Sequence, residues 1–500
     1  MSEVFAVRQF TGGMNDWVHP GLLHENTAAQ LVDAELDDGK LVPLKRPRAT
    51  PYADPASLAH YGTADRSVVK WNDRHYWSDN TATSAPYYGG TPENYLGIPF
   101  PAYSGTGKNV TVEKTSPGTG ETGMSGTFKY CVTFVNVNGW EGAPGSLEEY
   151  ETEVTLSTQI AAVTVTWSDS RISYAKIYRT IDHGADFYCV GEVSASGSVF
   201  RDTVTDELAQ MMNPLSTQYA YPPPDGGKFL CEYGGVFFLA VGSLLYFSAP
   251  GNPHAWPPTH FLGIDDTITG LVPEFQGILV FTRGNVYRVT GAEDPETVAK
   301  IYIPGNHGCV NFRSIATVNN APVWLSGSGI CIWDGDQVAV PSYQVIHTEN
   351  MGVKCAVSAH DRYFLFLNGK TIVFDRRNGD VFYTISPVCD YAWHDDSTDK
   401  LYLLAGGHIY EYGGGEPLTM TYVSPTIPGT QSAIRKFREI LLCGTGESRV
   451  TVSVDGKEIA DFVAASGRAR VKLPLSAVGG GLSCRIRNRG GIQEMAVIYD

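Results

Sequence analysis

The sequence has no apolar run near the roughly 18 residues that a membrane-spanning helix needs. Its start, from Met1 to Thr11, has no basic stretch followed by an apolar one, so we expect a protein made in the cytosol without a secretion signal. No two cysteines form a CxxC pair, and an odd number cannot all pair within one chain. We interpret the nine as buried reduced thiols: Cys131, Cys189, Cys231, Cys309, Cys331, Cys355, Cys389, Cys443 and Cys484.

Signatures of the common enzyme classes are also missing. The sequence has no HExxH zinc helix, no GxSxG nucleophile elbow and no paired-histidine spacing with a third ligand. A glycosidase needs two carboxylates across a groove, and 53 acidic residues leave such a pair open. We predict a non-enzymatic protein with no catalytic, cofactor-binding or metal-binding residues. The scattered histidines are interpreted as satisfied or exposed side chains, among them His254, His260, His307, His347 and His394.

Basic residues are scarce, with 37 Lys and Arg against 53 Asp and Glu, which gives a formal net charge of -16. Affinity for nucleic acid depends on cationic side chains that displace counterions, so this charge argues against a protein that wraps DNA. It suits a surface along which DNA passes without sticking. Simple solubility explains the charge equally well.

Two glycine-rich segments resemble nucleotide-binding motifs. Gly118–Gly123 (GTGETG) matches GxGxxG, but that motif works where a strand turns into a helix, and here the strand-like TFKYCVTF follows. We therefore interpret it as a hairpin loop. Gly105–Lys108 echoes a phosphate-binding loop, but Asn109 replaces the Ser or Thr and Ala102 stands where the first Gly belongs, so we reject it.

For two acidic segments, a metal-binding site is compared with an ordinary turn. His394–Asp399 (HDDSTD) offers three carboxylates, the ligand type that calcium prefers, although a solvated turn between strands fits at least as well. Asp375–Asp380 (DRRNGD) is interpreted as a hairpin turn around Asn378 and Gly379.

What is abundant is turn punctuation and β-favouring aromatics: 54 Gly, 29 Pro, 27 Tyr and 21 Phe in 500 residues. This mixture is typical of many short strands, and the length favours three or four domains. We predict an all-β protein: a β-propeller with an inserted fibronectin type III or immunoglobulin-like sandwich and a small C-terminal β-sandwich.

The predicted domains follow changes in pattern along the chain. Residues 1–60 lack periodicity and form an extended N-terminal arm lying on a neighbouring domain or subunit; residues 61–105 hold the first propeller strands. Residues 106–220 form the inserted sandwich, residues 221–430 the propeller, and residues 431–500 the C-terminal β-sandwich.

Within the sandwich we expect seven short strands, and Phe128, Tyr130, Val132 and Phe134 share one face of the second. A stiff linker, Tyr221–Gly227 (YPPPDGG), then closes it.

The propeller region shows a weak repeat about every 40 residues, which is in the range typical of propeller blades. Each unit is a strand, a Gly or Asn turn and a second strand with one aromatic residue. A hairpin around Trp71 is a candidate sixth unit, which makes the sandwich an insertion between blades. The five aromatic residues are Tyr246, Tyr287, Trp333, Phe374 and Tyr410.

Several of these segments together resemble one known family. They are FTGGMN (Phe10–Asn15), TFKYCVTFVNVNGWEGAPGS (Thr127–Ser146), YAKIYRT (Tyr174–Thr180), FYCVGEV (Phe187–Val193), VFRDTVTD (Val199–Asp206), LLYFSAPGNPHAWPP (Leu244–Pro258), GILVFTRGNVYRVTG (Gly277–Gly291) and GCVNFRSIATVNNAPVWLSGSGI (Gly308–Ile330). This succession is similar to the tail nozzle or tail tubular proteins of short-tailed bacteriophages. The resemblance covers most of the chain and is strongest from about residue 127 to 330.

The resemblance implies a structural virion protein of the phage tail, synthesised in the host cytoplasm. It would form a homo-oligomer, a hexameric ring, that conducts double-stranded DNA without binding it specifically and contacts an adaptor or head-to-tail connector and tail fibres or spikes. This sequence departs from the family in its compact C-terminal sandwich and in having no large platform insertion.

The resemblance also gives residues a structural role. It implies that Phe128, Tyr130 and Trp140 lie in the sandwich core and that Ile177–Arg179 form a packing edge. It makes SAPGNPHAWP a rigid loop held by its three prolines and Trp256.

Two other functions stay open at this point. One is a carbohydrate-binding adhesin or polysaccharide-degrading enzyme, which predicts a secretion signal or a groove with paired acids and exposed aromatics. The other is a protein-interaction scaffold, since the propeller fold alone does not fix function.

Overall fold

A computed structural model describes residues 2–51, 63–81, 86–88, 94–292, 294, 296–348, 352–377, 379–427 and 433–500. These residues form two compact units: residues 1–65, 269–288 and 301–500 make the first, and residues 66–268 and 289–300 make the second. Helices are short in the described part of the chain: η1 (Pro20–Leu22), α2 (Asp206–Ala209) and η2 (Phe312–Ser314). None of them is long and apolar enough to cross a membrane.

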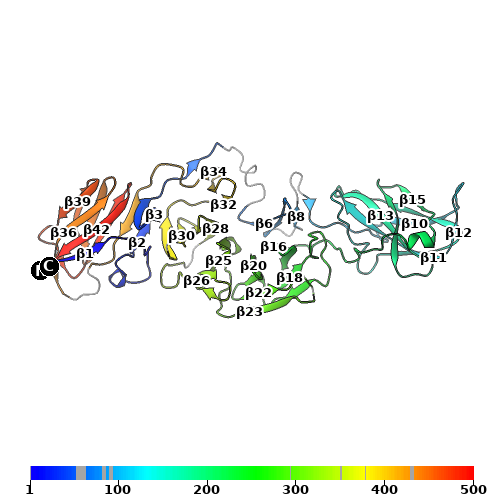
Figure 1. The fold of residues 1–500 in the computed structure, drawn as a ribbon, viewed down its shortest axis with the longest axis horizontal. Coiled ribbons are helices and arrows are strands. Elements are labelled where there is room, and N and C mark those ends of the chain that lie inside the picture. Colours follow the sequence, from blue (N-terminus) through cyan, green and yellow to red (C-terminus); the bar gives the residue numbers. More distant parts are fainter. Residues whose placement is uncertain are drawn as a thin grey trace. The chain divides into compact units, whose positions relative to one another are not determined.

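Four-stranded antiparallel sheets, the form of propeller blades, recur along the chain (Figure 1). The second unit holds two. They are β6 (Arg66–Trp71), β7 (Arg74–Asp79), β8 (Tyr87–Tyr88) and β9 (Asn94–Tyr95); and β16 (Lys228–Tyr233), β17 (Val236–Val241), β18 (Leu244–Phe247) and β19 (Phe261–Gly263). A shared apolar core that includes Tyr76, Phe237 and Trp256 packs these two sheets together.

The first unit holds three more series of this kind. They are β24 (Ala316–Val318), β25 (Ala321–Ser326), β26 (Gly329–Trp333) and β27 (Val338–Ala339); β28 (Val353–Ala359), β29 (Arg362–Leu367), β30 (Thr371–Asp375) and β31 (Val381–Ile385); and β32 (Tyr391–Asp395), β33 (Lys400–Ala405) and β34 (His408–Glu411), completed by β5 (Arg48–Ala49). A further sheet of β20 (Ile268–Glu274), β21 (Gly277–Thr282), β22 (Val286–Thr290) and β23 (Ala299–Ile303) has residues in both units.

The five repeated aromatic residues all occupy the third strand of their series, on β18, β22, β26, β30 and β34. The predicted repeat unit is therefore the second and third strands of each blade. The Trp71 hairpin consists of β6 and β7, the first and second strands of their sheet. It therefore corresponds to a different pair of blade strands from the other five units. Its sheet is nonetheless a four-stranded blade of the same form.

The amino-terminal segment of the chain is built into the first unit. Strand β5 pairs with β34 as the fourth strand of that sheet, and Arg48 forms an ion pair of 2.6 Å with Glu411. The strand β2 (Gln30–Val32) lies between β31 and β35 (Met420–Val423) and so joins a blade to the C-terminal module in one nine-stranded sheet.

The C-terminal module is a sandwich that takes strands from both ends of the chain. β1 (Glu3–Val7) pairs with β42 (Ile492–Tyr499), and Figure 1 marks the two termini side by side. The other strands of this sheet are β3 (Ala34–Asp37), β4 (Lys40–Pro43), β36 (Arg435–Gly444), β39 (Gly467–Lys472) and β40 (Val478–Gly479); the facing strands are β35, β37 (Ser448–Val454), β38 (Lys457–Ala464) and β41 (Leu482–Asn488).

The inserted sandwich has six strands: β10 (Val110–Thr115), β11 (Met124–Asn136), β12 (Thr152–Val165), β13 (Ile172–Thr180), β14 (Phe187–Val193) and β15 (Val199–Asp202). Two of the seven predicted strands are halves of β12. Its first half pairs with β11 and its second half with β10 and β15, so one strand serves two layers. The bend falls at Thr158, whose φ is +58°, and this local break is the reason that the sequence pattern divides β12 in two.

The predicted fold class is confirmed: the protein is all-β, with propeller blades, an inserted fibronectin type III or immunoglobulin-like sandwich and a small C-terminal β-sandwich. Phe128 and Tyr130 are buried in the insert, and Trp140 is half-buried against its core. The prediction of a packing edge at Ile177–Arg179 is wrong, because β13 pairs on both sides, with β11 and β14.

A buried charge network centres the insert. Arg179 and Asp202 are fully buried, with Nε and Oδ2 3.3 Å apart, and the Tyr130 hydroxyl donates to the same oxygen over 2.6 Å. The Arg179 guanidinium lies 4.7 Å from the ring centroid of Phe128 and pairs with Asp206 over 3.0 Å. The side chains of β11, β13, β15 and the first residue of α2 are thereby fixed together.

Replacing the buried cation tests this network. Arg179→Met leaves the Asp202 carboxylate buried without its ion-pair partner, and we expect the free energy of opening of the insert to fall by about 3–5 kcal/mol. Hydrogen exchange of the amides in β11 and β13 measures it. The control Arg201→Met removes a solvent-screened pair with Glu121 and should destabilise the insert much less than Arg179→Met does. Equal losses in the two variants would contradict the assignment.

Candidate functional site

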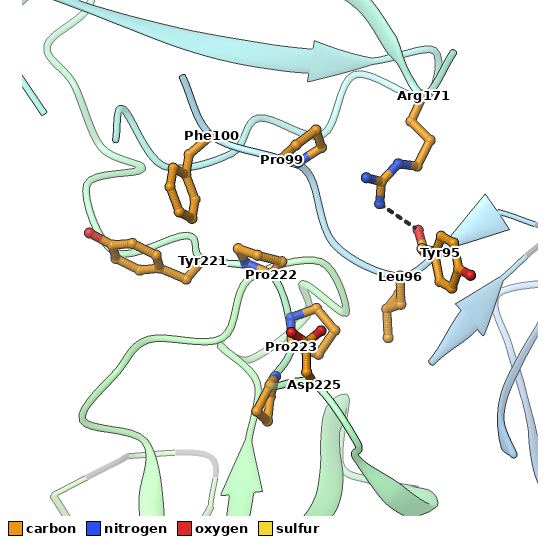
Figure 2. Close-up of a pocket in the computed structure, with 10 residues that line it drawn as sticks. Tyr95, Leu96, Pro99, Phe100, Arg171, Tyr221, Pro222, Pro223 and Asp225 are labelled. Atoms are coloured by element: carbon orange, nitrogen blue, oxygen red, sulfur yellow. Dashed lines mark hydrogen bonds between the residues drawn. The ribbon is translucent and has the colours of Figure 1, made fainter. Parts of the chain in front are cut away.

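The insert is joined to the blades of the second unit by two chain segments, residues 95–103 and 219–227 (Figure 2). The predicted stiff linker is the second of these. The two segments border a groove, which we call the junction groove. Its lining residues are Tyr95, Leu96, Pro99, Phe100, Arg171, Tyr221, Pro222, Pro223, Pro224 and Asp225.

Arg171, the residue before β13, fastens the first segment to the insert. Asp169 accepts from its Nε over 3.0 Å and from its Nη2 over 2.7 Å, which lowers the pKa of that carboxyl. Its Nη1 donates to the carbonyl oxygens of Gly97 over 3.3 Å and of Tyr95 over 3.4 Å, and Figure 2 shows the second bond. The guanidinium is thus positioned by a carboxylate and holds two backbone carbonyls.

The two segments are also in close contact with each other. Gly97 has φ +89°, and a Cβ there would lie 2.5 Å from the Cδ of Pro223 and 2.6 Å from the Cβ of Pro222. Only glycine fits this crossing without a shift of the prolines. The rings of Phe100 and Tyr221 meet edge to face with centroids 5.8 Å apart.

The loop SAPGNPHAWP completes the junction from the blade side, and its Trp256 is buried. The indole Nε1 of Trp256 donates to the carbonyl of Pro253 over 2.9 Å, and its backbone N–H donates to the carbonyl of Tyr221 over 2.8 Å. His254 is 1% exposed, and its Nδ1 accepts the backbone N–H of Gly97 over 3.2 Å. The loop therefore holds both linking segments.

The junction groove has aromatic walls but does not offer the chemistry of a glycosidase. Tyr95 and Phe100 are partly exposed beside the prolines. Asp225 is the only carboxylate among the described lining residues, so this groove lacks the two opposed acids that glycoside hydrolysis needs.

The glycine-rich segments lie in turns. Gly118–Gly123 is part of the β10–β11 loop, where the carboxylate of Glu121 accepts from the backbone N–H of Gly118 and pairs with Arg201. No helix begins there, so the segment has no helical N–H groups to hold a phosphate. Gly105–Lys108 forms an exposed turn with φ +72° at Gly105.

The acidic segments differ from each other. In Asp375–Asp380, Asp375 is buried and pairs with Arg377 over 2.6 Å, while Arg376 pairs with Asp380 over 3.2 Å. These carboxylates are neutralised by arginines; Asn378 lies outside the described residues. In His394–Asp399, Asp395 accepts from the hydroxyls of Ser397 and Thr398 and so caps its own turn.

The histidines are not all isolated. His260 stacks on Phe247, His347 lies against Trp17, and burial lowers the pKa of His307. His394, however, meets His360 and Asp399, a grouping that sequence reasoning misses because the partners lie on two different hairpins. Its only sequence signal is the neighbouring acidic segment.

The cysteines are free thiols. Seven are buried, and Cys189 and Cys443 are partly exposed. Burial raises the pKa of Cys309, Cys331 and Cys484 to about 12, so these thiols stay protonated at neutral pH. Cys355 and Cys389 have sulfurs 3.8 Å apart, a contact between thiols.

The buried His254 makes the junction sensitive to acid. Burial, reinforced by Arg74 and Arg171, lowers its pKa to about 3, against about 6.5 in an unfolded chain. Its contribution to stability is complete above pH 6.5 and is lost as the pH falls toward 3, because the unfolded chain then binds the extra proton.

We expect this effect to cost about 3 kcal/mol at pH 4.5, about two units below the unfolded pKa. His254→Asn retains an acceptor for the Gly97 N–H but does not titrate, so its stability should fall less between pH 7 and 4.5. Urea unfolding of both proteins at the two pH values measures the difference. Parallel losses would contradict the role of His254.

Comparisons with known proteins give similarity in fold only. No known protein family matches the sequence, and no curated protein matches it. Among solved structures, BamB from Moraxella catarrhalis has a TM-score of 0.28 and 9% identity over 61% of this chain and 98% of that chain. The WD40 domain of Neurospora crassa Pan2 has 0.27 and 10% over 52% and 84%. An exo-beta-1,3-galactanase from Phanerochaete chrysosporium has 0.21 and 10% over 90% and 100%. TM-scores this low carry no argument about function.

Proposed function

We propose that the protein is a structural subunit of a bacteriophage tail, a nozzle or tail-tube protein that forms a ring, conducts the genome during ejection and anchors neighbouring tail proteins or fibres. The observation that carries this proposal is the locked, two-segment junction of the inserted sandwich. An assembly subunit must present its contact module in a fixed orientation, and Arg171, Gly97 and His254 restrain both segments.

The segments that carry the family resemblance coincide with this framework. Thr127–Ser146 contains most of β11, and Leu244–Pro258 contains β18 and the loop that holds both linking segments. These motifs supply core and junction contacts, and such contacts are what a structural role needs.

The surfaces we propose for partner contacts are the exposed hairpin tips of the insert. Val137 is 73% exposed and Leu147 62% in the β11–β12 connection, and Met211, just after α2, is 81% exposed, so these side chains offer apolar area for a partner to cover. The N-terminal residues are less suited, since Val7, Leu31 and Leu36 are buried within the first unit.

Acidic and basic residues are distributed unevenly along the chain, and this limits which parts of the proposed ring suit a channel for DNA. Residues 106–220 contain 14 Asp and Glu against 7 Lys and Arg, whereas residues 431–500 contain 11 Lys and Arg against 7 Asp and Glu. Acidic surface repels the duplex and basic surface attracts it. In the proposed ring, residues 431–500 are therefore less suited than residues 106–220 to line the channel.

The ring is tested on the full-length chain by sedimentation over a range of concentrations, with negative-stain images of each species. We expect rings of about six subunits with a central channel, because closed cyclic symmetry is the usual form of such assemblies. Replacing Met211 by Asp should weaken assembly, while Asp at the already polar Thr158 should not. A monomer at all concentrations would contradict the proposal.

DNA conduction is tested separately by titrating the isolated ring with duplex DNA at several salt concentrations. We expect no measurable binding at about 0.15 M salt, since an acidic wall offers few cations to displace counterions. Tight binding that ignores sequence at this salt concentration would contradict a channel along which DNA slides.

A carbohydrate-binding adhesin is a second candidate, and the aromatic walls of the junction groove favour it. Tyr95, Phe100 and Tyr221 present ring surfaces beside Arg171, a combination that suits a sugar ring. A monomer that binds glycan through this groove would favour the adhesin over the tail subunit.

A further inference from the structure

Two hairpin turns of the first unit bring three metal-ligand side chains together. His360 lies in the turn between β28 and β29, where it and Asp361 have φ +50° and +59°. His394 lies near the end of β32, and Asp399, with φ +52°, ends the turn that leads into β33. Because β28 and β32 are neighbours, the two turns meet at one edge.

Two of the three distances between ligand atoms fit a small metal ion. Oδ1 of Asp399 is 3.1 Å from Nε2 of His394 and 3.4 Å from Nε2 of His360, and all the ligand atoms lie within 4.8 Å of one another. Ligands about 2.0–2.1 Å from a tetrahedral Zn²⁺ are about 3.3 Å apart. The two nitrogen-to-oxygen separations therefore already match the edges of such a site.

The second nitrogen of His394 is engaged by a carboxylate. Its Nδ1 is 3.0 Å from Oδ1 of Asp396, and a proton on Nδ1 makes that contact a hydrogen bond. Neutral His394 then directs the lone pair of Nε2 at the carboxylate of Asp399, so two acceptors face each other. A cation between them, or a second proton on the ring, resolves this conflict. Carboxylates that orient the distal nitrogen of a ligating histidine are a regular feature of zinc sites.

The ligand set indicates which ion would bind. Calcium takes oxygen ligands only, whereas two imidazoles and one carboxylate suit zinc and the neighbouring transition metals. Asp396 adds negative charge beside the ligands, while the nearby Lys400 is paired with Glu411 over 3.1 Å. The sequence suggests a calcium site built from carboxylate oxygens. With two imidazoles, the ligand set contains both nitrogen and oxygen.

We propose that His360, His394 and Asp399 bind one divalent transition-metal ion, which ties the β28–β29 turn to the β32–β33 turn. The site lies at the protein surface, with side-chain exposures of 35%, 20% and 77% for the three ligands, so solvent completes the coordination. The ion would act as a crosslink between adjacent hairpins. This inference is independent of the proposed function.

The test is calorimetric titration of the metal-free full-length chain with Zn²⁺. We expect one site per chain, and a thermal midpoint that rises with Zn²⁺ concentration, since an ion that binds only the folded state stabilises it. His360→Asn, His394→Gln and Asp399→Asn should abolish this site. Asn tolerates the positive φ of positions 360 and 399, so these changes preserve the turns. Asp396→Asn should weaken binding about 10–100-fold.

Two control variants separate this site from general surface binding. Asp361→Asn removes a carboxylate from the same turn as His360, and His408→Asn removes an exposed imidazole from the neighbouring strand β34; both should bind Zn²⁺ like the natural chain. Thermal unfolding without metal verifies that every variant is folded. Absence of Zn²⁺ binding, or equal binding in the ligand and control variants, would show a purely hydrogen-bonded cluster and overturn the proposal.

Discussion

The backbone groups at the edge of a β-sheet need partners, and the way this chain covers its edges organises the first unit. The strand β5 supplies the fourth strand of the β32–β34 sheet, although it lies far from β34 in the sequence. The strand β2 covers β31 and continues into the C-terminal module. An ion pair of 3.0 Å between Glu35 and the buried Arg362 then attaches β3 to the same blade. Residues without any periodic pattern of their own thereby complete two sheets.

Local sequence patterns predict the parts of this fold that are formed by residues close together in the chain. The aromatic residue on the third strand of each blade is visible in the sequence because it recurs at a regular spacing beside Gly and Asn turns. Pairings such as Arg48 with Glu411 leave no such trace, because neither partner signals the other over that distance. The bend of β12 at Thr158 shows in the sequence only as a gap between two predicted strands, because no glycine marks the positive φ and the change of pairing partner leaves no local signal.

The candidate sites also combine local features, which the sequence predicts, with contacts between distant residues, which it does not. The stiff linker is predictable from its prolines, and the loop with Trp256 is expected from the family resemblance, but their contact through Gly97 and His254 depends on the tertiary fold. His394 stands out beside its acidic neighbours, and His360 does not, since it belongs to an earlier and ordinary hairpin turn. Sequence reasoning identifies segments that carry chemistry and cannot assemble side chains from separate hairpins.

The pairing of β1 and β4 with β42 has a consequence for biosynthesis. Residues 492–499 leave the ribosome long after residues 3–43, so these early strands remain without their partner while most of the chain is translated. The inserted sandwich has all its strands between residues 110 and 202 and can close during translation. Nascent chains would therefore expose β1 and the open edge of the β3–β4 hairpin for a long interval, during which chaperones or neighbouring nascent chains compete for them.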